Sequence, residues 1–284
     1  MIKIVADTTC SVPRDQLADL DIPVLPQIII FGEDSYRDDT EIDTATFLEK
    51  LKAAPTLPKT AAPPPSLYNP IFQQYAKQGD TIIVVTPSSE ISGTYRSAVV
   101  ASNDFPEADI RIVDSRTIAG GLGQIVLQAR DWVQKGVDAD TLIKQLEEMI
   151  PRNRTYFVVD TLEYLHKGGR IGGAQALFGS ILQVKPILVL RDGRTEPLET
   201  QRTKKRAFLR MQQFVVDQCP CTPEARLSIS QCEAYDEAAE MADYFKKTLG
   251  IPEIPIYEAP PAIVVHGGPK IMSFSFFTDH IKNN

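Results

Sequence analysis

The sequence predicts an α/β fold with two domains, a Rossmann-like N-terminal domain built on a parallel sheet and a C-terminal α+β domain with antiparallel strand pairing. Three observations predict this fold class. The chain has 284 residues, which is long for a single hydrophobic core. Its first half alternates short apolar, β-branched runs with helical patterns. Its second half carries Asp192-Gly193 between two apolar runs, which is a strong hairpin signal.

The first half starts with alternating elements and then reaches a proline-rich segment. The patterns predict a strand, a short helix, an extended segment and a second helix, over Ile2–Ala6, Arg14–Leu20, Pro23–Phe31 and Thr44–Ala54. Residues 55–70 then contain six prolines, a density that excludes an interior helix or strand. We expect this segment to be a loop or crossing segment that packs on the second domain.

A β-α-β-α pattern follows the proline-rich segment. After a helix that ends at Gly79, the sequence predicts a strand over residues 81–85, a helix over about 92–103, a strand over 110–113 and a long helix after Thr117. This alternation implies parallel strands with helices on both faces of the sheet.

The second half has a different order of elements, and the change falls near residues 150–154. We therefore expect domains at residues 1–153 and 154–284, with the ligand at their interface, because clefts between domains are the usual place for ligands. The expected strands are Thr155–Val159, Val184–Leu190, Arg194–Leu198, Arg226–Ser230 and the segments near Ile254–Tyr257 and Ile263–Val265. The expected helices are Thr203–Gln218 and Glu233–Leu249.

Composition limits the compartment and the partners. The net charge of −7 argues against a nucleic-acid-binding surface, which needs an excess of basic residues. The first residues enter a strand pattern directly, so we expect no signal peptide, and no apolar run approaches the length of a membrane span. The four cysteines have neither zinc nor redox spacing. We expect a cytoplasmic protein with reduced thiols and no metal site.

A loop of hydroxyl side chains separates the predicted strand 81–85 from the following helix. Its last residues, Ser92, Gly93 and Thr94, lie at the helix entrance. Backbone N–H groups and the positive end of the helix dipole favour an anion there. The simpler interpretation is that Ser92 or Thr94 only caps the helix. We expect Ser92 to be the leading ligand of a carboxylate, with Gly93 and Thr94 beside it.

Other catalytic and nucleotide-binding motifs are missing from the sequence. It contains no P-loop, no Gly-x-Gly-x-x-Gly and no His-Glu-x-x-His. The residue types of a serine hydrolase are present, with Ser92 as nucleophile, His266 as base and Asp7 as orienting carboxylate, but without a Gly-x-Ser-x-Gly elbow. A serine hydrolase is therefore kept as the alternative from another class of function.

Several sequence blocks occur in a fixed order along the chain. They are Val5-Ala6-Asp7-Thr8-Thr9, Ile91-Ser92-Gly93-Thr94-Tyr95, Val113-Asp114-Ser115-Arg116-Thr117, Lys167-Gly168-Gly169-Arg170-Ile171, Lys185-Pro186-Ile187-Leu188 and His266-Gly267-Gly268-Pro269. In this order and spacing they resemble the DegV family of bacterial fatty-acid-binding proteins, over essentially the whole chain.

The resemblance implies a lipid-binding protein and not an enzyme. Members of that family bind one long-chain fatty acid in a buried tunnel, with no other cofactor, and present its carboxylate to a separate ATP-dependent acyl kinase. The kinase makes an acyl phosphate for phospholipid metabolism. Such a role allows peripheral or transient contact with a membrane. A lipid-sensing regulator without a kinase partner is a further alternative.

The resemblance also implies roles for particular residues at the carboxylate. Thr60 matches a threonine in a family block whose usual polar pair is replaced here by Ala61 and Ala62. His266 follows a β-branched run and precedes two glycines, a context typical of a cleft-facing residue. Neutral donors such as these orient a carboxylate and leave one oxygen free for attack on a phosphate.

Basic residues are expected at the rim of the site and at a partner surface. Arg170 follows two glycines, and its planar guanidinium suits a carboxylate or phosphate. Arg202 and Lys204 open a basic helix in an otherwise acidic protein, and we expect them to dock the kinase. Apolar side chains within residues 176–182 are candidates for the lining of an acyl tunnel, although such a run more commonly belongs to an ordinary hydrophobic core.

Overall fold

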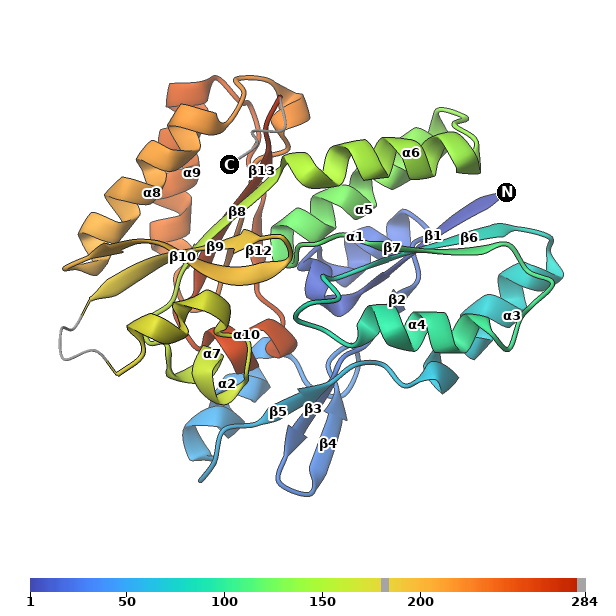
Figure 1. Ribbon diagram of the computed structural model, residues 1–284, viewed down its shortest axis with the longest axis horizontal. Helices are drawn as coiled ribbons and strands as arrows, with labels where there is room; N and C mark the ends of the chain where they lie inside the picture. Colours follow the sequence, from blue (N-terminus) through green and yellow to red (C-terminus); the bar gives the residue numbers. More distant parts are fainter. Residues whose placement is uncertain (180–183, 280–284) are drawn as a thin grey trace.

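The computed structural model describes residues 1–179 and 184–279, which Figure 1 shows as two main sheets with helices packed on their faces. The first sheet has the strand order β2-β1-β6-β7. Its strands are Ile2–Asp7 (β1), Val24–Leu25 (β2), Thr81–Thr86 (β6) and Ile110–Asp114 (β7). All neighbouring pairs run parallel, so the expected parallel N-terminal sheet is confirmed.

Helices cover both faces of this sheet, because successive side chains of a strand point to opposite faces. Ile83 and Val85 of β6 belong to one apolar core, and Ile82 and Val84 belong to the core on the other side. The first face is covered by Arg14–Asp19 (α1), Ala119–Gln134 (α5) and Ala139–Met149 (α6). The opposite face is covered by Asn69–Lys77 (α3) and Thr94–Ser102 (α4).

The second sheet has six strands in the order β10-β9-β8-β13-β11-β12. Neighbouring strands are antiparallel except for β11 and β12, which pair in parallel. The strands are Asn153–Val158 (β8), Lys185–Arg191 (β9), Arg194–Gln201 (β10), Ser228–Gln231 (β11), Ile256–Glu258 (β12) and Met272–Phe277 (β13). The hairpin expected at Asp192-Gly193 joins β9 to β10.

The two faces of the six-stranded sheet carry different helices. Tyr156 and Val158 of β8 pack in the core under Lys204–Gln218 (α8) and Tyr235–Leu249 (α9). Phe157 points to the other face, where it packs with side chains of Thr44–Ala53 (α2), Glu163–Lys167 (α7) and Pro261–Gly267 (α10).

Helix α5 lies between the two sheets and contacts β1, β6, β11 and β13. Its glycines allow this close approach. A Cβ on Gly120 would lie 2.5 Å from Ser228 Oγ, and one on Gly123 would lie 2.4 Å from the carbonyl oxygen of Cys10. The Gly120-Gly121-Leu122-Gly123 run therefore serves the packing of α5.

A small third sheet, of order β4-β3-β5, corrects the expectation for the proline-rich segment. Its strands are Ile28–Phe31 (β3), Asp34–Arg37 (β4) and Lys59–Ala61 (β5). Strand β5 lies within the segment that was expected to be a loop, and it is tolerated there because it is an edge strand between prolines. Both β3 and β5 contact α10. Short 3₁₀ turns occupy Thr8–Cys10, Pro65–Leu67, Ile150–Arg152, Gly172–Leu177 and Pro223–Ala225.

The expectation of a strand at Ile263–Val265 is wrong, because these residues belong to α10. Pro260 and Pro261 suit the first turn of a helix, where no backbone N–H is needed. All five residues 261–265 are buried, so the run has no polar face to distinguish a helix from a strand. The expected elements also omitted β13, a central strand, and treated α5 and α6 as one helix.

Candidate functional site

An apolar cavity lies between the six-stranded sheet, α10 and the loop that precedes α4. The cavity itself has a volume of about 90 Å³, and the space reaches about 700 Å³ only when the open solvent at its mouth is counted. Its apolar lining comes from Ile91, Ile118, Ala119, Phe157, Leu165, Leu190, Ala259, Ala262, Ile263 and Ile271. Of the expected tunnel segment, residues 176–179 do not line this cavity, and residues 180–182 lie outside the described part of the chain.

Arg170 and His266 lie at the neck of this cavity. Both residues also line an outer cleft, which continues from the neck along the proline-rich segment. The other residues of that cleft are Pro55, Thr56, Leu57, Pro58, Lys59, Thr60, Tyr164, Lys167, Gly168 and Val265. A ligand in the apolar cavity would therefore reach the surface past a histidine, an arginine and Thr60.

Thr60 and His266 form a hydrogen-bonded pair at this neck. The Oγ1 atom of Thr60 lies 2.8 Å from Nε2 of His266. Burial, and to a smaller extent the charge of Arg170, lowers the pKa of His266 to about 4. The imidazole is therefore neutral near pH 7, so the pair offers neutral hydrogen-bonding groups and no additional positive charge.

Ser92 lies at the N-terminus of α4, on the loop that carries Ile91 into the cavity wall. The backbone N–H of Thr94 donates to Ser92 Oγ at 3.2 Å, and the two hydroxyl oxygens lie 2.9 Å apart. A Cβ on Gly93 would lie 3.4 Å from Cβ of Ala62, so this loop contacts the residues just after β5. The fold thus brings Ser92, Gly93 and Thr94 to the strand that carries Thr60.

Arg170 links the α7 turn to the hydroxyl loop. Its Nε donates to the carbonyl oxygen of Ile91 at 3.0 Å, and its Nη1 donates to the carbonyl oxygen of Gly168 at 2.7 Å. Gly168 itself is packed against His266, because a Cβ on this glycine would lie 2.3 Å from His266 Nδ1. Gly168, the first of the two glycines that precede Arg170, is therefore required by space, a role that its position in the sequence did not reveal.

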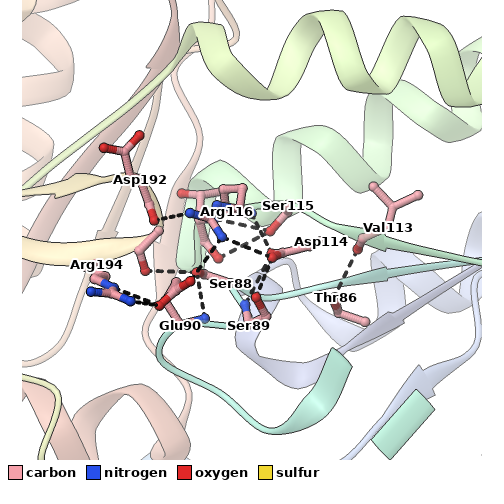
Figure 2. A network of polar contacts seen from close by, with 12 residues as sticks. Thr86, Ser88, Ser89, Glu90, Val113, Asp114, Ser115, Arg116, Asp192 and Arg194 are labelled. Carbon is pink, nitrogen blue, oxygen red and sulfur yellow. Dashed lines mark hydrogen bonds and ion pairs between the residues drawn. The ribbon is translucent and has the colours of Figure 1, made fainter. Parts of the chain in front are cut away.

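The hairpin between β9 and β10 holds the start of the hydroxyl loop, as Figure 2 shows. Buried Ser88 donates from Oγ to the carbonyl oxygen of Gly193 at 2.8 Å, and Arg194 pairs with Glu90. The backbone N–H of Ser92 in turn donates to the carbonyl oxygen of Ser88 at 3.0 Å. Sequence reasoning missed this connection, although Ser88 stands in the quoted loop and Gly193 in the quoted hairpin.

Arg202 and Lys204 do not join this cluster. Lys204 opens α8, where its Nζ lies 3.3 Å from Glu237 Oε1 and over the ring of Phe208. Helix α8 packs on the face of the six-stranded sheet opposite to the cavity, whereas Arg170 lines the cavity. A continuous basic patch that joins these residues to Arg170 is therefore not formed.

The serine-hydrolase alternative lacks its geometry. His266 Nε2 faces Thr60, and no hydrogen bond links His266 to Ser92 within the described residues. Asp7 is buried and accepts hydrogen bonds from Thr9 and Gln27. The carboxylate therefore does not orient the imidazole, as a Ser–His–Asp triad requires.

Within residues 1–179 and 184–279, no cluster of three or more histidine, cysteine or acidic side chains is arranged to hold a metal ion. No helix in this part of the chain has both the length and the apolar character that crossing a membrane requires.

Similarity to bacterial proteins covers nearly the whole chain. The chain is 32% identical over 279 residues to a DegV domain-containing protein of Halalkalibacterium halodurans, and the match covers 98% of this chain and 99% of that protein. It is 34% identical over 274 residues to a DegV domain-containing protein of Streptomyces coelicolor, with 95% and 96% covered.

Solved structures show the same fold. A DegV family protein from Thermus thermophilus, described by its fatty acid binding, superposes with a TM-score of 0.87 at 28% identity, covering 98% of this chain and 99% of that one. DegV from Bacillus subtilis, a fatty acid binding protein, superposes with a TM-score of 0.83 at 30% identity over the same shares. Residues 1–279 match the family described as uncharacterised proteins of the DegV type. The chain therefore belongs to the DegV family.

Proposed function

We propose that this chain binds one long-chain fatty acid, with the acyl chain in the apolar cavity and the carboxylate between Ser92, Thr60 and His266. The observation that carries the proposal is the hydrogen-bonded pair of Thr60 and His266 at the neck of a cavity with an apolar lining, with Ser92 next to Ile91 of the cavity wall. The relatives from Thermus thermophilus and Bacillus subtilis, which bind fatty acids, support the same ligand.

Most of the affinity would come from the acyl chain. Each buried methylene contributes about 0.8 kcal/mol, so a long chain has on the order of 10 kcal/mol available before the costs of binding. The serine hydroxyls of the cavity wall already have hydrogen-bond partners in the protein, so an apolar ligand would not leave them without partners. Ser230 Oγ accepts from the backbone N–H of Gly120 at 3.2 Å, and Ser273 Oγ donates to the carbonyl oxygen of Ser230 at 3.5 Å.

The carboxylate would be held by neutral groups. A hydroxyl from Ser92 and the Thr60–His266 pair can each donate to an oxygen without a full ion pair. The Arg170 guanidinium lies at the neck, where its charge favours an anion while two of its N–H groups are used by backbone carbonyls. One carboxylate oxygen can then remain available to a reactant outside the cavity.

The presentation of that oxygen to a separate ATP-dependent acyl kinase is the second half of the proposal. The kinase would transfer a phosphoryl group to the carboxylate, which gives an acyl phosphate for phospholipid synthesis. The sequence has no P-loop of its own, which is consistent with a partner that supplies the nucleotide site. Because ATP is the phosphoryl donor, we assign the protein to the cytoplasm.

The binding half is tested with purified protein and an unbiased lipid analysis. We expect mass spectrometry of the organic extract to find one unreacted fatty acid per chain. Substitution Ser92→Ala should weaken binding of oleate by about 1–3 kcal/mol, the value of a hydrogen bond to a charged group. Ser102→Ala, which removes a hydroxyl from the far end of α4, is the matched control. Unchanged affinity of the Ser92 variant would contradict the carboxylate assignment.

The kinase half needs a different readout. The loaded protein is mixed with ATP and the acyl kinase of the same organism, and acyl phosphate is trapped as the hydroxamate. Formation of hydroxamate from the bound lipid supports presentation to the kinase. A protein that binds fatty acid but never yields hydroxamate would instead be a lipid-sensing regulator.

A further inference from the structure

A chain of buried polar side chains runs from the interior of the parallel sheet to Ser92. It consists of Asp7 at the end of β1, Gln27 between β2 and β3, and Thr94 in the first turn of α4. Asp7, Gln27 and Thr94 are exposed by only 1%, 4% and 1%. Groups buried this deeply keep a fixed pattern of donors and acceptors, because no water can replace a missing partner.

The side-chain amide of Gln27 gives this chain its direction. Its Nε2 donates to Asp7 Oδ2 at 2.7 Å and to Thr94 Oγ1 at 2.9 Å, which uses both amide hydrogens. Rotating the amide by 180° would place its oxygen against the Asp7 carboxylate, so the observed orientation is strongly preferred. The backbone of Gln27 is fixed as well, since its N–H donates to Asp38 Oδ1 at 2.7 Å.

We propose that Gln27 is a positioning residue for the carboxylate site, which orients the Thr94 and Ser92 hydroxyls so that Ser92 Oγ–H points toward the ligand. The inference rests on the proposed fatty-acid binding. Thr94 Oγ1 accepts from Gln27 and is then free to donate its own hydrogen to Ser92 Oγ, 2.9 Å away. Ser92 Oγ also accepts from the Thr94 backbone N–H at 3.2 Å. With two donors on its oxygen, Ser92 directs its hydrogen outward.

Without the amide donor of Gln27, the direction of the hydrogen bonds between Asp7, Thr94 and Ser92 would reverse. The Thr94 hydroxyl has one hydrogen and two acceptors within reach, the Asp7 carboxylate and Ser92 Oγ, so the amide donor of Gln27 decides between them. If Thr94 donates inward, Ser92 must donate to Thr94, and its lone pairs then face the ligand carboxylate. Asp38, Cys10 and Tyr68 lie close enough to Asp7 to feel its charge, and none of the three side chains carries a positive charge.

The experiment measures oleate affinity of the whole protein by isothermal titration calorimetry at pH 8. Gln27→Glu replaces the donor by an acceptor, and we expect affinity to fall roughly ten-fold or more. The matched control is Gln74→Glu, which adds the same charge on the exposed side of α3 and should bind as wild type. Thr94→Val removes the hydroxyl whose donated hydrogen can change direction, so the loss of oleate affinity should be smaller than for Gln27→Glu.

The decisive variant combines the two substitutions. The double variant Gln27→Glu/Thr94→Val has no Thr94 hydroxyl that could donate toward Asp7. Its oleate affinity should therefore recover to that of Thr94→Val alone. A purely structural role of Gln27 predicts instead that the double variant binds more weakly than either single variant. That result, or wild-type affinity of Gln27→Glu, would overturn the inference.

A variant that keeps the shape of the side chain covers the case in which Gln27→Glu fails to fold. Gln27→Met removes the donor without adding charge, and a folded Gln27→Met should also lose affinity. Wild-type affinity in that variant would overturn the inference. If Ser92→Ala weakens binding while the Gln27 variants do not, only the inference fails, whereas absence of oleate binding by the wild-type protein would remove the proposed function itself.

Discussion

Thr60 Oγ1 and His266 Nε2 lie 2.8 Å apart, although 206 positions separate the two residues in the chain. Thr60 lies on an edge strand of the small sheet, and His266 lies in the last turn of α10. Their hydrogen bond joins the proline-rich segment to the helix that borders the apolar cavity. The neck of the candidate site is therefore assembled from segments that are far apart in the sequence, including Arg170 from the middle of the chain.

Ser92 and His266 should act on the same ligand group. We expect Ser92→Ala and His266→Ala each to weaken oleate binding, and the double variant to lose less than the sum of the two single losses, because both side chains contact one carboxylate. Calorimetric titration of the four proteins gives the coupling free energy. Strictly additive losses would place His266 at a different site.

The contact between Gly168 and His266 predicts a position-specific effect of a single methyl group. Gly168→Ala would bring its Cβ within 2.3 Å of His266 Nδ1 and 2.9 Å of the Tyr164 carbonyl oxygen, so we expect displacement of the imidazole and weaker oleate binding. Gly169→Ala is the matched control. Its Cβ meets no atom within 4 Å, and its positive φ should cost about 1 kcal/mol of stability without a comparable loss of affinity. Equal affinities of the two variants would show that His266 is not held by Gly168.

The Ser88–Gly193 hydrogen bond should stabilise the packing of the β9–β10 hairpin on the hydroxyl loop. Ser88→Ala leaves a carbonyl group without its partner at a buried position, so we expect the free energy of unfolding to fall by about 1–3 kcal/mol. Urea denaturation of Ser88→Ala and Ser89→Ala provides the comparison. Because Ser89 is exposed, Ser89→Ala should lower the free energy of unfolding by less than about 1 kcal/mol. A larger loss for the exposed serine would be evidence against this role.

Asp38 should make stability decrease as the pH rises. Burial raises its pKa from 3.8 to about 7, although hydrogen bonds from Thr8 and Gln27 oppose the shift. The folded protein therefore binds more protons than the unfolded chain between about pH 4 and pH 7, so this group's contribution is lost over that interval. We expect the unfolding free energy of wild type minus that of Asp38→Asn to fall from pH 4 to pH 7 and then level off. A difference that rises with pH would contradict a buried carboxyl group with a raised pKa.

The basic residues at the start of α8 should contribute to the interaction with the partner kinase and not to lipid binding. Arg202 and Lys204 do not line the cavity, so charge reversal of both should leave oleate affinity intact and lower acyl-phosphate formation. Added salt should weaken the coupling of the wild-type protein to the kinase, because exposed charges are screened. The same reversal at Lys135 and Lys144, exposed on the other sheet's helices, is the control. Loss of lipid binding in the α8 variant would give the cluster a structural role.

Local patterns in the sequence were sufficient for much of the fold. The β-branched runs at residues 2–6, 81–85 and 110–113 became parallel strands, and Thr203 caps α8 through a hydrogen bond to the Arg206 backbone N–H. Strand periodicity and helix capping depend on neighbouring residues, so they can be recognised without knowledge of distant contacts. The hydroxyl loop before α4 was recognised for the same reason.

The sequence by itself therefore determined the fold class, the helix and strand segments with clear patterns, and the candidate residues Ser92, Thr60, His266 and Arg170. The tertiary structure alone decided that Ile263–Val265 form a helix, because a fully buried run carries no periodic signal. It also decided that His266 pairs with Thr60, that Gly168 must lack a side chain, and that Arg202 and Lys204 lie on the opposite face of a sheet. These relationships arise from the packing of segments that are far apart in sequence, and no local pattern records which atoms such packing brings together.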